Sequence, residues 1–265
     1  MIKDITIGQY LPGDSFVHKL DPRTKLIIAI LFVVCLFIMD KLFGYVFVIG
    51  FIGFAAYIAK IPFRYLYKGL KPVFFLIILT AVLNLFMLKG GDLILEIGFI
   101  KIYETGVTTA VFMAARLILL IMGTSILTLS TSPMELTDGI ERFLKPIGKE
   151  MAHELSMMMT IALRFIPTLI DETDKIMKAQ KARGADFDNG GIIQKAKSLI
   201  PLLVPLFISS FRRADELAMA MEARCYRGGS GRTRMKVLKF TKKDFIAFGA
   251  FAVLAGISFF IRFAM

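Results

Sequence analysis

The feature that most constrains this chain is a series of apolar segments that approach the length of a membrane-spanning helix. A helix rises about 1.5 Å per residue, so about 20 mostly apolar residues cross a hydrocarbon core of about 30 Å. Backbone groups in lipid must be hydrogen-bonded within their own segment, which predicts helices. The five candidate segments are Lys25–Met39, Phe43–Ala59, Val73–Leu88, Val107–Leu129 and Phe245–Phe263. The first three are short and need flanking residues to complete a crossing.

Composition supports a membrane protein. Hydrophobic residues make up 56% of the 265 residues, and the mean hydropathy is +0.68. That is more apolar than an ordinary soluble domain. The net charge of +12 does not require a nucleic-acid partner, because Lys and Arg accumulate on the cytoplasmic side of polytopic membrane proteins.

The distribution of Lys and Arg between the segments predicts the orientation. Basic residues cluster before the first segment and between the second and third, whereas residues 89–106 set two lysines against three acidic residues. The N-terminus has no signal-peptide pattern and is predicted to be cytoplasmic, with the C-terminus outside. We therefore expect a multi-pass protein of the cell (inner or plasma) membrane.

Residues 130–244 differ from the rest of the chain, because they carry most of the remaining basic residues. The predicted division is 1–129 (N-terminal segment and four membrane helices), 130–244 (cytoplasmic helical region) and 245–265 (a last membrane helix). A short helix is predicted over Pro133–Lys149, with Ser132 as its N-cap and Glu135 at its third position.

Two apolar runs, at 155–170 and 198–211, lie within that cytoplasmic region. Each is too short for a span, and Arg164 and prolines interrupt them, so we expect them at the membrane interface. Each run continues into a charged helical stretch. The fold class predicted is therefore all-α: a polytopic membrane protein with about five transmembrane helices and two long cytoplasmic helices.

A repeated motif marks where these two charged stretches end. Asp174–Arg183 and Asp215–Arg224 share the pattern D-x4-A-x2-A-R. The i, i+3 spacing of the alanines presents a smooth face to which another backbone can approach, and the Arg offers a fork for a carboxylate or carbonyl pair. Gly184 is a natural helix stop after the first copy, whereas the second helix could run on slightly beyond Cys225. A solvent-exposed helix end without a partner is the alternative, and the duplication argues against it.

Enzymatic and cofactor motifs are missing from the sequence. It contains no Walker A pattern and no G-x-S-x-G, and its two histidines, His18 and His153, are far apart. We therefore predict no catalytic residues, no metal site and no cofactor. Asn84 and Arg116 are polar residues inside predicted spans, and for Arg116 a functional role and a helix–helix hydrogen bond remain open.

Three motifs in order resemble one family. The stretch QYLPGDSFVHKLDPRTKL at residues 9–26 resembles the N-terminal signature of the transmembrane T components of energy-coupling factor (ECF) transporters. Ala182-Arg183-Gly184 and Ala223-Arg224-Cys225 resemble that family's pair of coupling motifs, with Cys225 where the family often has Gly. The resemblance covers essentially the whole chain.

The resemblance implies an assembly. A T component joins two cytoplasmic ECF ATPase subunits, which bind the ATP, to a membrane S component that captures a vitamin or transition-metal ion. The two helix ends would then be coupling helices, each seated in one ATPase. S components would dock on the apolar flanks of the two helices. The candidate docking residues are Met157, Met158, Met159, Pro167, Pro201 and Pro205.

The main alternative is a membrane-embedded enzyme acting on a lipid or prenyl substrate. It would need clustered carboxylates at the membrane face, and Asp171-Glu172-x-Asp174 is the acidic cluster that comes closest. The same residues also fit ordinary helix-surface charge beside Lys175 and Lys178. A secondary transporter is disfavoured by the scarcity of polar residues within the spans.

Overall fold

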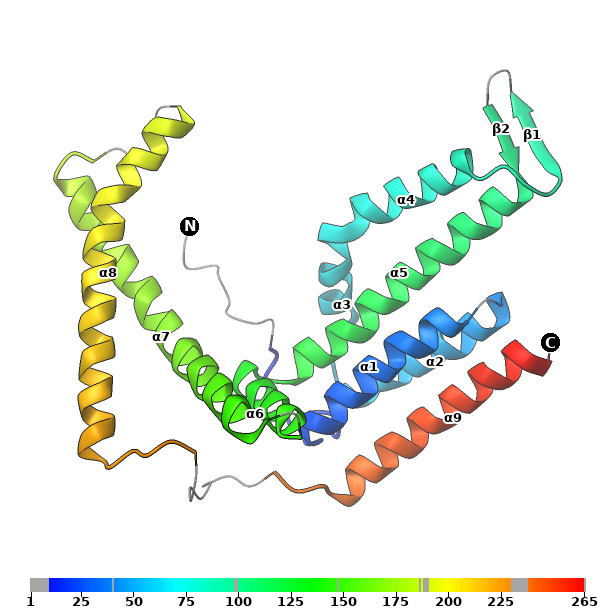
Figure 1. Cartoon of the computed structure of the whole chain (residues 1–265). Coiled ribbons are helices and arrows are strands. Elements are labelled where there is room, and N and C mark those ends of the chain that lie inside the picture. Colours follow the sequence, from blue (N-terminus) through cyan, green and yellow to red (C-terminus); the bar gives the residue numbers. More distant parts are fainter. Residues whose placement is uncertain are drawn as a thin grey trace. The chain divides into compact units, whose positions relative to one another are not determined.

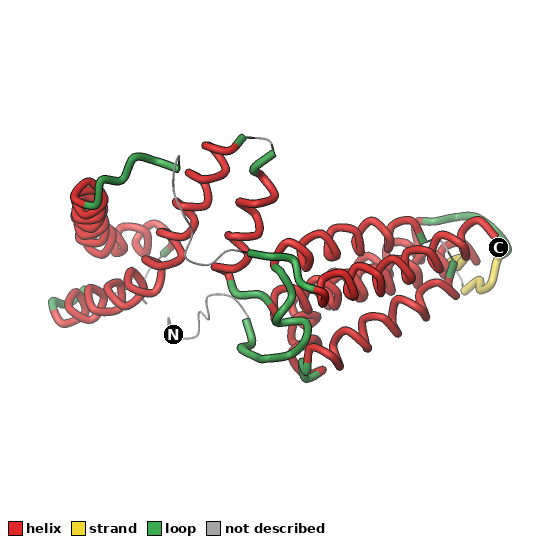
Figure 2. Tube along the Cα trace, turned by 90° about the horizontal axis from the view of Figure 1, so that it is seen from below, coloured by secondary structure: helices red, strands yellow, loops and turns green. Residues whose placement is uncertain are grey.

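The computed structural model of the chain is mostly helical (Figures 1 and 2), which confirms the predicted all-α class. It describes residues 10–39, 41–97, 100–146, 148–185, 187, 191–229 and 238–264. These residues belong to two compact units. The bundle unit comprises Gly8–Gly139 and Lys236–Met265, and the arm unit contains Ile140–Met235.

All five predicted apolar segments of the bundle unit are helical. They correspond to α1 (Pro22–Ile38), α2 (Leu42–Ala59), α3 (Phe63–Leu70) with η2 (Lys71–Val73) and α4 (Phe74–Met87), α5 (Glu104–Ser130), and α9 (Lys242–Ala264). Among the described residues, three stretches are long and apolar enough to cross a membrane: Phe63–Met87, Glu104–Ser130 and Lys242–Arg262. Helices α1 and α2 are shorter, so the number of five spans stays a prediction.

The core of the bundle unit lies between α1, α2, α5 and α9. Its buried side chains include Phe32, Leu36, Tyr45, Val48, Leu119, Leu129, Phe251 and Leu254. Helix α4 packs along α5. The outward faces of these helices remain apolar, and Phe75, for example, is 75% exposed. Apolar side chains both inside and outside a bundle are expected when lipid is the solvent.

Residues 89–106, which connect the third and fourth apolar segments, contain a small hairpin. Strands β1 (Leu93–Ile97) and β2 (Ile100–Tyr103) pair antiparallel between α4 and α5. Gly91 precedes β1 with a φ of 73°, and the backbone N–H of Glu104 donates to Asp92 O at 3.0 Å. The hairpin thus satisfies backbone groups that a plain loop would leave to solvent.

Two arginines cap the C-terminal end of α1. Arg116 of α5 donates to Met39 O at 2.9 Å and to Tyr45 Oη at 3.3 Å. Arg262 of α9 donates to Ile38 O at 2.9 Å. The last carbonyls of a helix have no partner within it, and in an apolar setting they need one. These contacts support the helix–helix hydrogen bond for Arg116.

The arm unit is formed mainly by two long helices, α7 (Lys149–Ala182) and α8 (Ile192–Ala223). They run in opposite directions, so their C-terminal ends lie at opposite ends of the pair (Figure 1). Both helices continue through their prolines, Pro167 in α7 and Pro201 and Pro205 in α8. The predicted arms are therefore present, but the prolines do not interrupt them.

The predicted short helix before the arms is α6 (Pro133–Leu144). The backbone N–H of Glu135 donates to Ser132 Oγ at 3.2 Å, which confirms the predicted N-cap. The helix ends at Leu144 and not at Lys149, because Lys149 begins α7.

Removal of the Arg116 guanidinium tests the cap on α1. We expect Arg116→Met to lower the stability of the bundle by roughly 1–3 kcal/mol, because Met39 O loses its charged donor. Unfolding can be followed in detergent, in a Cys225→Ser background, by reaction of a thiol dye with the buried Cys35. Arg64→Met, at an exposed position, is the control and should unfold like the parent. Equal stability of the two variants would contradict the cap.

Candidate functional site: two helix ends and an exposed apolar face

The first copy of the repeat ends α7 in a well-defined cap. Arg183 is the C-cap residue, and Gly184 follows it with a φ of 88°. The N–H of Ala185 donates to Gln180 O and the N–H of Gly184 donates to Lys181 O, both at 3.0 Å. This pair of bonds is the Schellman arrangement, in which the left-handed residue after the cap turns the chain back onto the last carbonyls.

The second copy ends α8 in the same way. Arg224 is the C-cap residue, the N–H of Tyr226 donates to Met221 O at 3.0 Å, and the N–H of Cys225 donates to Glu222 O at 2.8 Å. Each bond is the counterpart of one in the first copy. Helix α8 therefore stops at the same point of the repeat as α7, and the expected run-on of the second helix is wrong.

Cys225 occupies the left-handed position that Gly184 occupies in the first copy, with a φ of 53°. An L-residue pays about 1–2 kcal/mol in this conformation, which glycine avoids. A cysteine in this position therefore leaves the cap intact but locally strained.

All six predicted coupling residues are exposed. Ala182, Arg183 and Gly184 lie at the surface of the α7 end, and Ala223, Arg224 and Cys225 lie at the surface of the α8 end. The preceding alanines of the repeats, Ala179 and Ala220, are exposed as well. Each helix end thus presents small side chains next to one guanidinium, which can donate two parallel hydrogen bonds to a carboxylate. The acidic residue of the first repeat, Asp174, forms an i, i+4 pair with Lys178 at 4.0 Å.

A continuous apolar face runs along α8. Its exposed members recur at helical spacing, which places them on one side of the helix. They are Ile200, Leu203, Val204, Phe207, Ile208 and Phe211, each at least 44% exposed. A large exposed apolar face on a soluble surface marks a site of interaction with protein or membrane.

The predicted docking residues lie partly on exposed surface. Met158 and Met159 of α7 are exposed, and Met157 is half-buried. Pro167 and Pro201 are exposed and Pro205 is half-buried. The residues of the α8 apolar face were not singled out individually by the sequence analysis, although their spacing within residues 198–211 could have identified them.

An ion pair between the two arms was missed by the sequence analysis. Arg213 of α8 donates to Glu172 Oε2 of α7 at 2.7 Å. The neighbouring Ser209 hydroxyl, and after it the hydrogen-bonded guanidinium of Arg213, lower the pKa of the Glu172 carboxyl below its ordinary value. The acidic cluster Asp171-Glu172-x-Asp174 is thus partly neutralised by Arg213 and Lys178, which disfavours it as the catalytic carboxylate cluster of an enzyme.

The chain that follows α8 returns to the start of α7. Tyr226, Arg227, Gly228 and Gly229 line a cavity of ≈ 440 Å³ together with residues of the first turns of α7, which are Glu150, His153, Glu154, Met157 and Met158. A Cβ atom at Gly229 would lie 2.6 Å from His153 Cδ2. Only glycine fits this close approach, which holds the segment after the second cap against the first arm.

Known proteins resemble this chain over most of its length. The family model CbiQ, described as cobalt transport protein, matches residues 13–236. The energy-coupling factor transporter transmembrane protein EcfT of Clostridium kluyveri is 62% identical over 99% of this chain and 98% of the relative. The proteins of the same description from Thermosediminibacter oceani and Bacillus subtilis are 58% and 47% identical, over 99% of this chain in each case. The matched regions cover 99% of the Thermosediminibacter oceani protein and 100% of the Bacillus subtilis protein.

The strained cap at Cys225 gives a prediction of opposite sign at the two repeats. We expect Cys225→Gly to stabilise the α8 end by about 0.5–1 kcal/mol, because the relieved strain exceeds the ordinary entropic cost of glycine. Gly184→Ala should destabilise the α7 end, because alanine is strained at the positive φ of this position. A Cβ there would meet no atom within 4 Å, so the backbone conformation alone opposes the substitution. Hydrogen exchange of the Tyr226 amide measures the stability of the α8 cap, and that of the Ala185 amide measures the stability of the α7 cap. Faster exchange at Tyr226 in Cys225→Gly would refute the strain argument.

The ion pair between the arms gives a pH prediction. The pKa of Glu172 is lowered in the folded chain, so the pair contributes full stability above the unfolded pKa of about 4.3. That contribution is lost as the pH falls further, through the lowered pKa. Hydrogen exchange of α7 and α8 between pH 7 and pH 3, corrected for intrinsic rates, measures the loss. Glu172→Gln should remove this pH-dependent part, whereas the exposed Asp171→Asn should keep it.

Proposed function

The chain belongs to the CbiQ and EcfT family of energy-coupling factor (ECF) transporter transmembrane proteins, and from this premise we propose its role in the transporter. It transmits ATP-driven movement from two cytoplasmic ATPase subunits to a membrane S component, for uptake of a vitamin or a transition-metal ion. The chain itself is non-catalytic and holds no cofactor, because ATP is bound by the partner subunits.

The pair of identically capped helix ends carries this proposal. Two ATPase subunits require two contacts, and the chain offers two exposed guanidinium groups, Arg183 and Arg224, at the same position of the same cap. Because α7 and α8 are antiparallel, the two ends lie far apart and can serve separate subunits. A helix end with small side chains and one arginine fits a groove with an acidic residue at its base.

The S component has a candidate docking surface on the same unit. The apolar face of α8 supplies aliphatic and aromatic side chains, and the exposed Met158 and Met159 of α7 add flexible, unbranched ones of the kind that accommodates more than one partner. Side chains that can change rotamer to fit differently shaped partners suit a subunit that serves S components of different specificity.

The arrangement of helices in the bundle supports the proposed orientation. The start of α1 is hydrogen-bonded both to the start of α9, through Asp21 N and Asp244 Oδ1, and to the end of α5, through Lys25 Nζ and Ser130 O. These three helix ends therefore lie on one side of the bundle, which we assign to the cytoplasm because Lys and Arg gather there. The N-terminus and the arm unit are then cytoplasmic, and the C-terminus is outside.

Charge reversal at the two helix ends tests the proposal. In the complex purified with its ATPase subunits and an S component, we expect Arg183→Glu or Arg224→Glu alone to lower substrate uptake steeply. Truncation of one partner of a buried charge pair costs about 2–5 kcal/mol, and reversal costs at least as much. Uptake is measured with radiolabelled vitamins, Ni²⁺ or Co²⁺, with the probe that the unaltered complex accumulates.

Lys178→Glu is the matched control, because it reverses a charge near the end of α7 outside the cap, at a side chain that is 78% exposed. It should leave uptake close to that of the parent. ATP hydrolysis by the isolated chain should be absent, and it should appear only with the ATPase subunits. Normal uptake in both arginine variants, with the complex intact, would show that the helix ends do not engage the ATPases.

A further inference from the structure

The N-terminal stretch of residues 10–25 contacts the two places where the bundle unit connects along the chain to the arm unit. The first place is the end of α5, from which the chain leads through α6 into the arm unit. Lys25 Nζ donates to Ser130 O at 2.8 Å, and both residues are buried. The N–H of Leu11 donates to Leu129 O at 2.9 Å. The end of α5 is thereby held from two points of the stretch.

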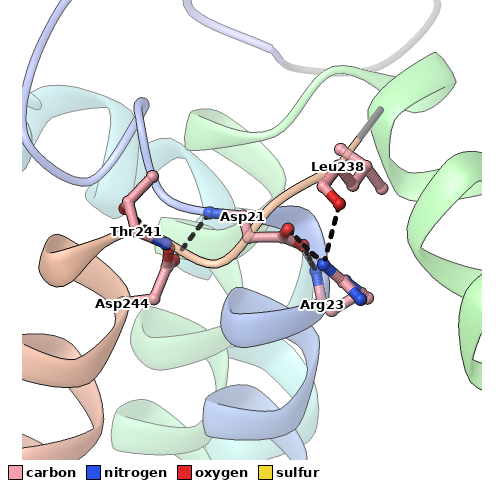
Figure 3. Close-up of polar contacts among 5 residues, drawn as sticks. All are labelled: Asp21, Arg23, Leu238, Thr241 and Asp244. Atoms are coloured by element: carbon pink, nitrogen blue, oxygen red, sulfur yellow. Dashed lines mark hydrogen bonds and ion pairs between the residues drawn. The ribbon is translucent and has the colours of Figure 1, made fainter. Parts of the chain in front are cut away.

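The second place is the start of α9, where the chain returns from the arm unit (Figure 3). The Asp244 carboxylate is 1% exposed and accepts three hydrogen bonds. They come from the N–H of Asp21 at 2.8 Å and from the N–H and the Oγ1 of Thr241, each at 2.7 Å. A buried carboxylate with three donors is strongly held, so it fixes the start of α9 to the start of α1.

Arg23 extends this contact to the residues before α9 (Figure 3). Its guanidinium donates to both carboxylate oxygens of Asp21, at 3.0 and 2.8 Å, and to Leu238 O at 3.4 Å. It also lies over the ring of Phe240, 4.1 Å from the ring centroid. One side chain thus holds the returning chain by its backbone and by an aromatic ring.

The stretch is braced internally, so it can resist displacement. The ring of His18 is hydrogen-bonded to Ser15 Oγ at 2.6 Å and to Leu11 O at 2.9 Å. Lys25 Nζ also donates to His18 O at 3.2 Å. Leu11 and Lys25, which hold the end of α5, are thus both hydrogen-bonded to His18, and the stretch contacts α5 as one piece.

We propose that residues 10–25 form a collar that anchors both chain connections to the bundle, and that Arg23, Lys25 and Asp244 are positioning residues for energy coupling. The inference rests on the proposed function. Movement of the arm unit pulls on the chain at both connections. A connection anchored at its bundle end passes the movement to α1, α5 and α9, whereas a loose connection absorbs it. Weakening of the collar should therefore uncouple ATP hydrolysis from uptake and leave the complex assembled.

A reversible cross-link provides the test. All variants are made in a Cys35→Ala, Cys225→Gly background, in which glycine occupies the left-handed cap position, and the ratio of ATP hydrolysed to substrate taken up in this background is the reference. In it, Arg23→Cys and Leu238→Cys remove the anchor of the returning chain, and a short bifunctional thiosulfonate reagent can replace it. The complex with its ATPase and S subunits is assayed in proteoliposomes, with the vitamin or metal ion that the parent accumulates. The measured quantity is the number of ATP molecules hydrolysed per substrate molecule taken up. We expect this ratio to rise several-fold in the double-cysteine variant without the cross-link. The cross-link should restore the ratio of the background, and reductant should raise it again.

An exposed pair in the same stretch serves as the matched control. Asp14 and Lys19 form a contact of 3.9 Å at side chains that are 99% and 53% exposed, so Asp14→Cys with Lys19→Cys should leave the ratio unchanged with or without the reagent. Arg23→Lys is a milder variant. It keeps the positive charge but loses the planar guanidinium that donates to both carboxylate oxygens of Asp21, so it should also raise the ratio. It keeps the test decisive if the cysteine pair assembles poorly.

The outcomes are distinguishable. An unchanged ratio in Arg23→Lys or in the reduced cysteine pair overturns the inference. The inference is also overturned if assembly and ATP hydrolysis fall by the same factor as uptake and do not recover on cross-linking, because that pattern indicates a purely structural contact. If the parental chain neither binds the ATPases nor supports uptake, the proposed function itself fails, and the inference fails with it.

Discussion

The bundle depends on the buried carboxylate of Asp244. It accepts the backbone N–H of Asp21 and so joins the start of the first helix to the start of the last, 223 residues apart along the chain. At the other end of the same two helices, Arg262 of α9 donates to Ile38 O of α1. The first contact satisfies a backbone N–H that would otherwise be buried without a partner, and the second satisfies one of the last carbonyls of α1, which have no partner within the helix. With both ends tied, α1 and α9 form a parallel pair on which α2 and α5 complete the core.

In the arm unit, the caps at the ends of α7 and α8 place one arginine at a defined position at the end of each helix. A helix end frays unless its last carbonyls are capped, and a frayed end would let the arginine take many positions. The repeat removes this freedom in both copies with the same two backbone bonds, although one copy uses Gly184 and the other Cys225 in the left-handed position. The shared geometry, and not the identity of the residue after the arginine, is thus what the duplication preserves.

Local features of the fold could be predicted from the sequence because their causes are local. Apolar length predicted the helices of the bundle, Ser132 and Glu135 predicted a cap, and Gly184 predicted a helix stop. Contacts between distant residues could not be predicted in this way. The pairing of Glu172 with Arg213 depends on the register of two antiparallel helices, and the partner of Arg116 on where α1 ends. Prolines 167, 201 and 205 interrupt the apolar runs as candidate spans, but they do not end α7 or α8.

The contrast between the two units bears on how such a protein moves. The bundle unit has a continuous core, whereas the buried residues described in the arm unit, Glu141, Ala152, Ser156 and Leu202, form no comparable cluster. Much of the apolar surface of α8 remains uncovered, so the arms bury little of their own surface against each other. Low local burial gives low local stability, and elements that move are drawn from that end of the range. The arms can therefore change their packing when a partner covers them, while the bundle and its anchored connections remain fixed. A weakly packed pair of arms, joined to a bundle with a continuous core, is what the proposed transmission of movement requires.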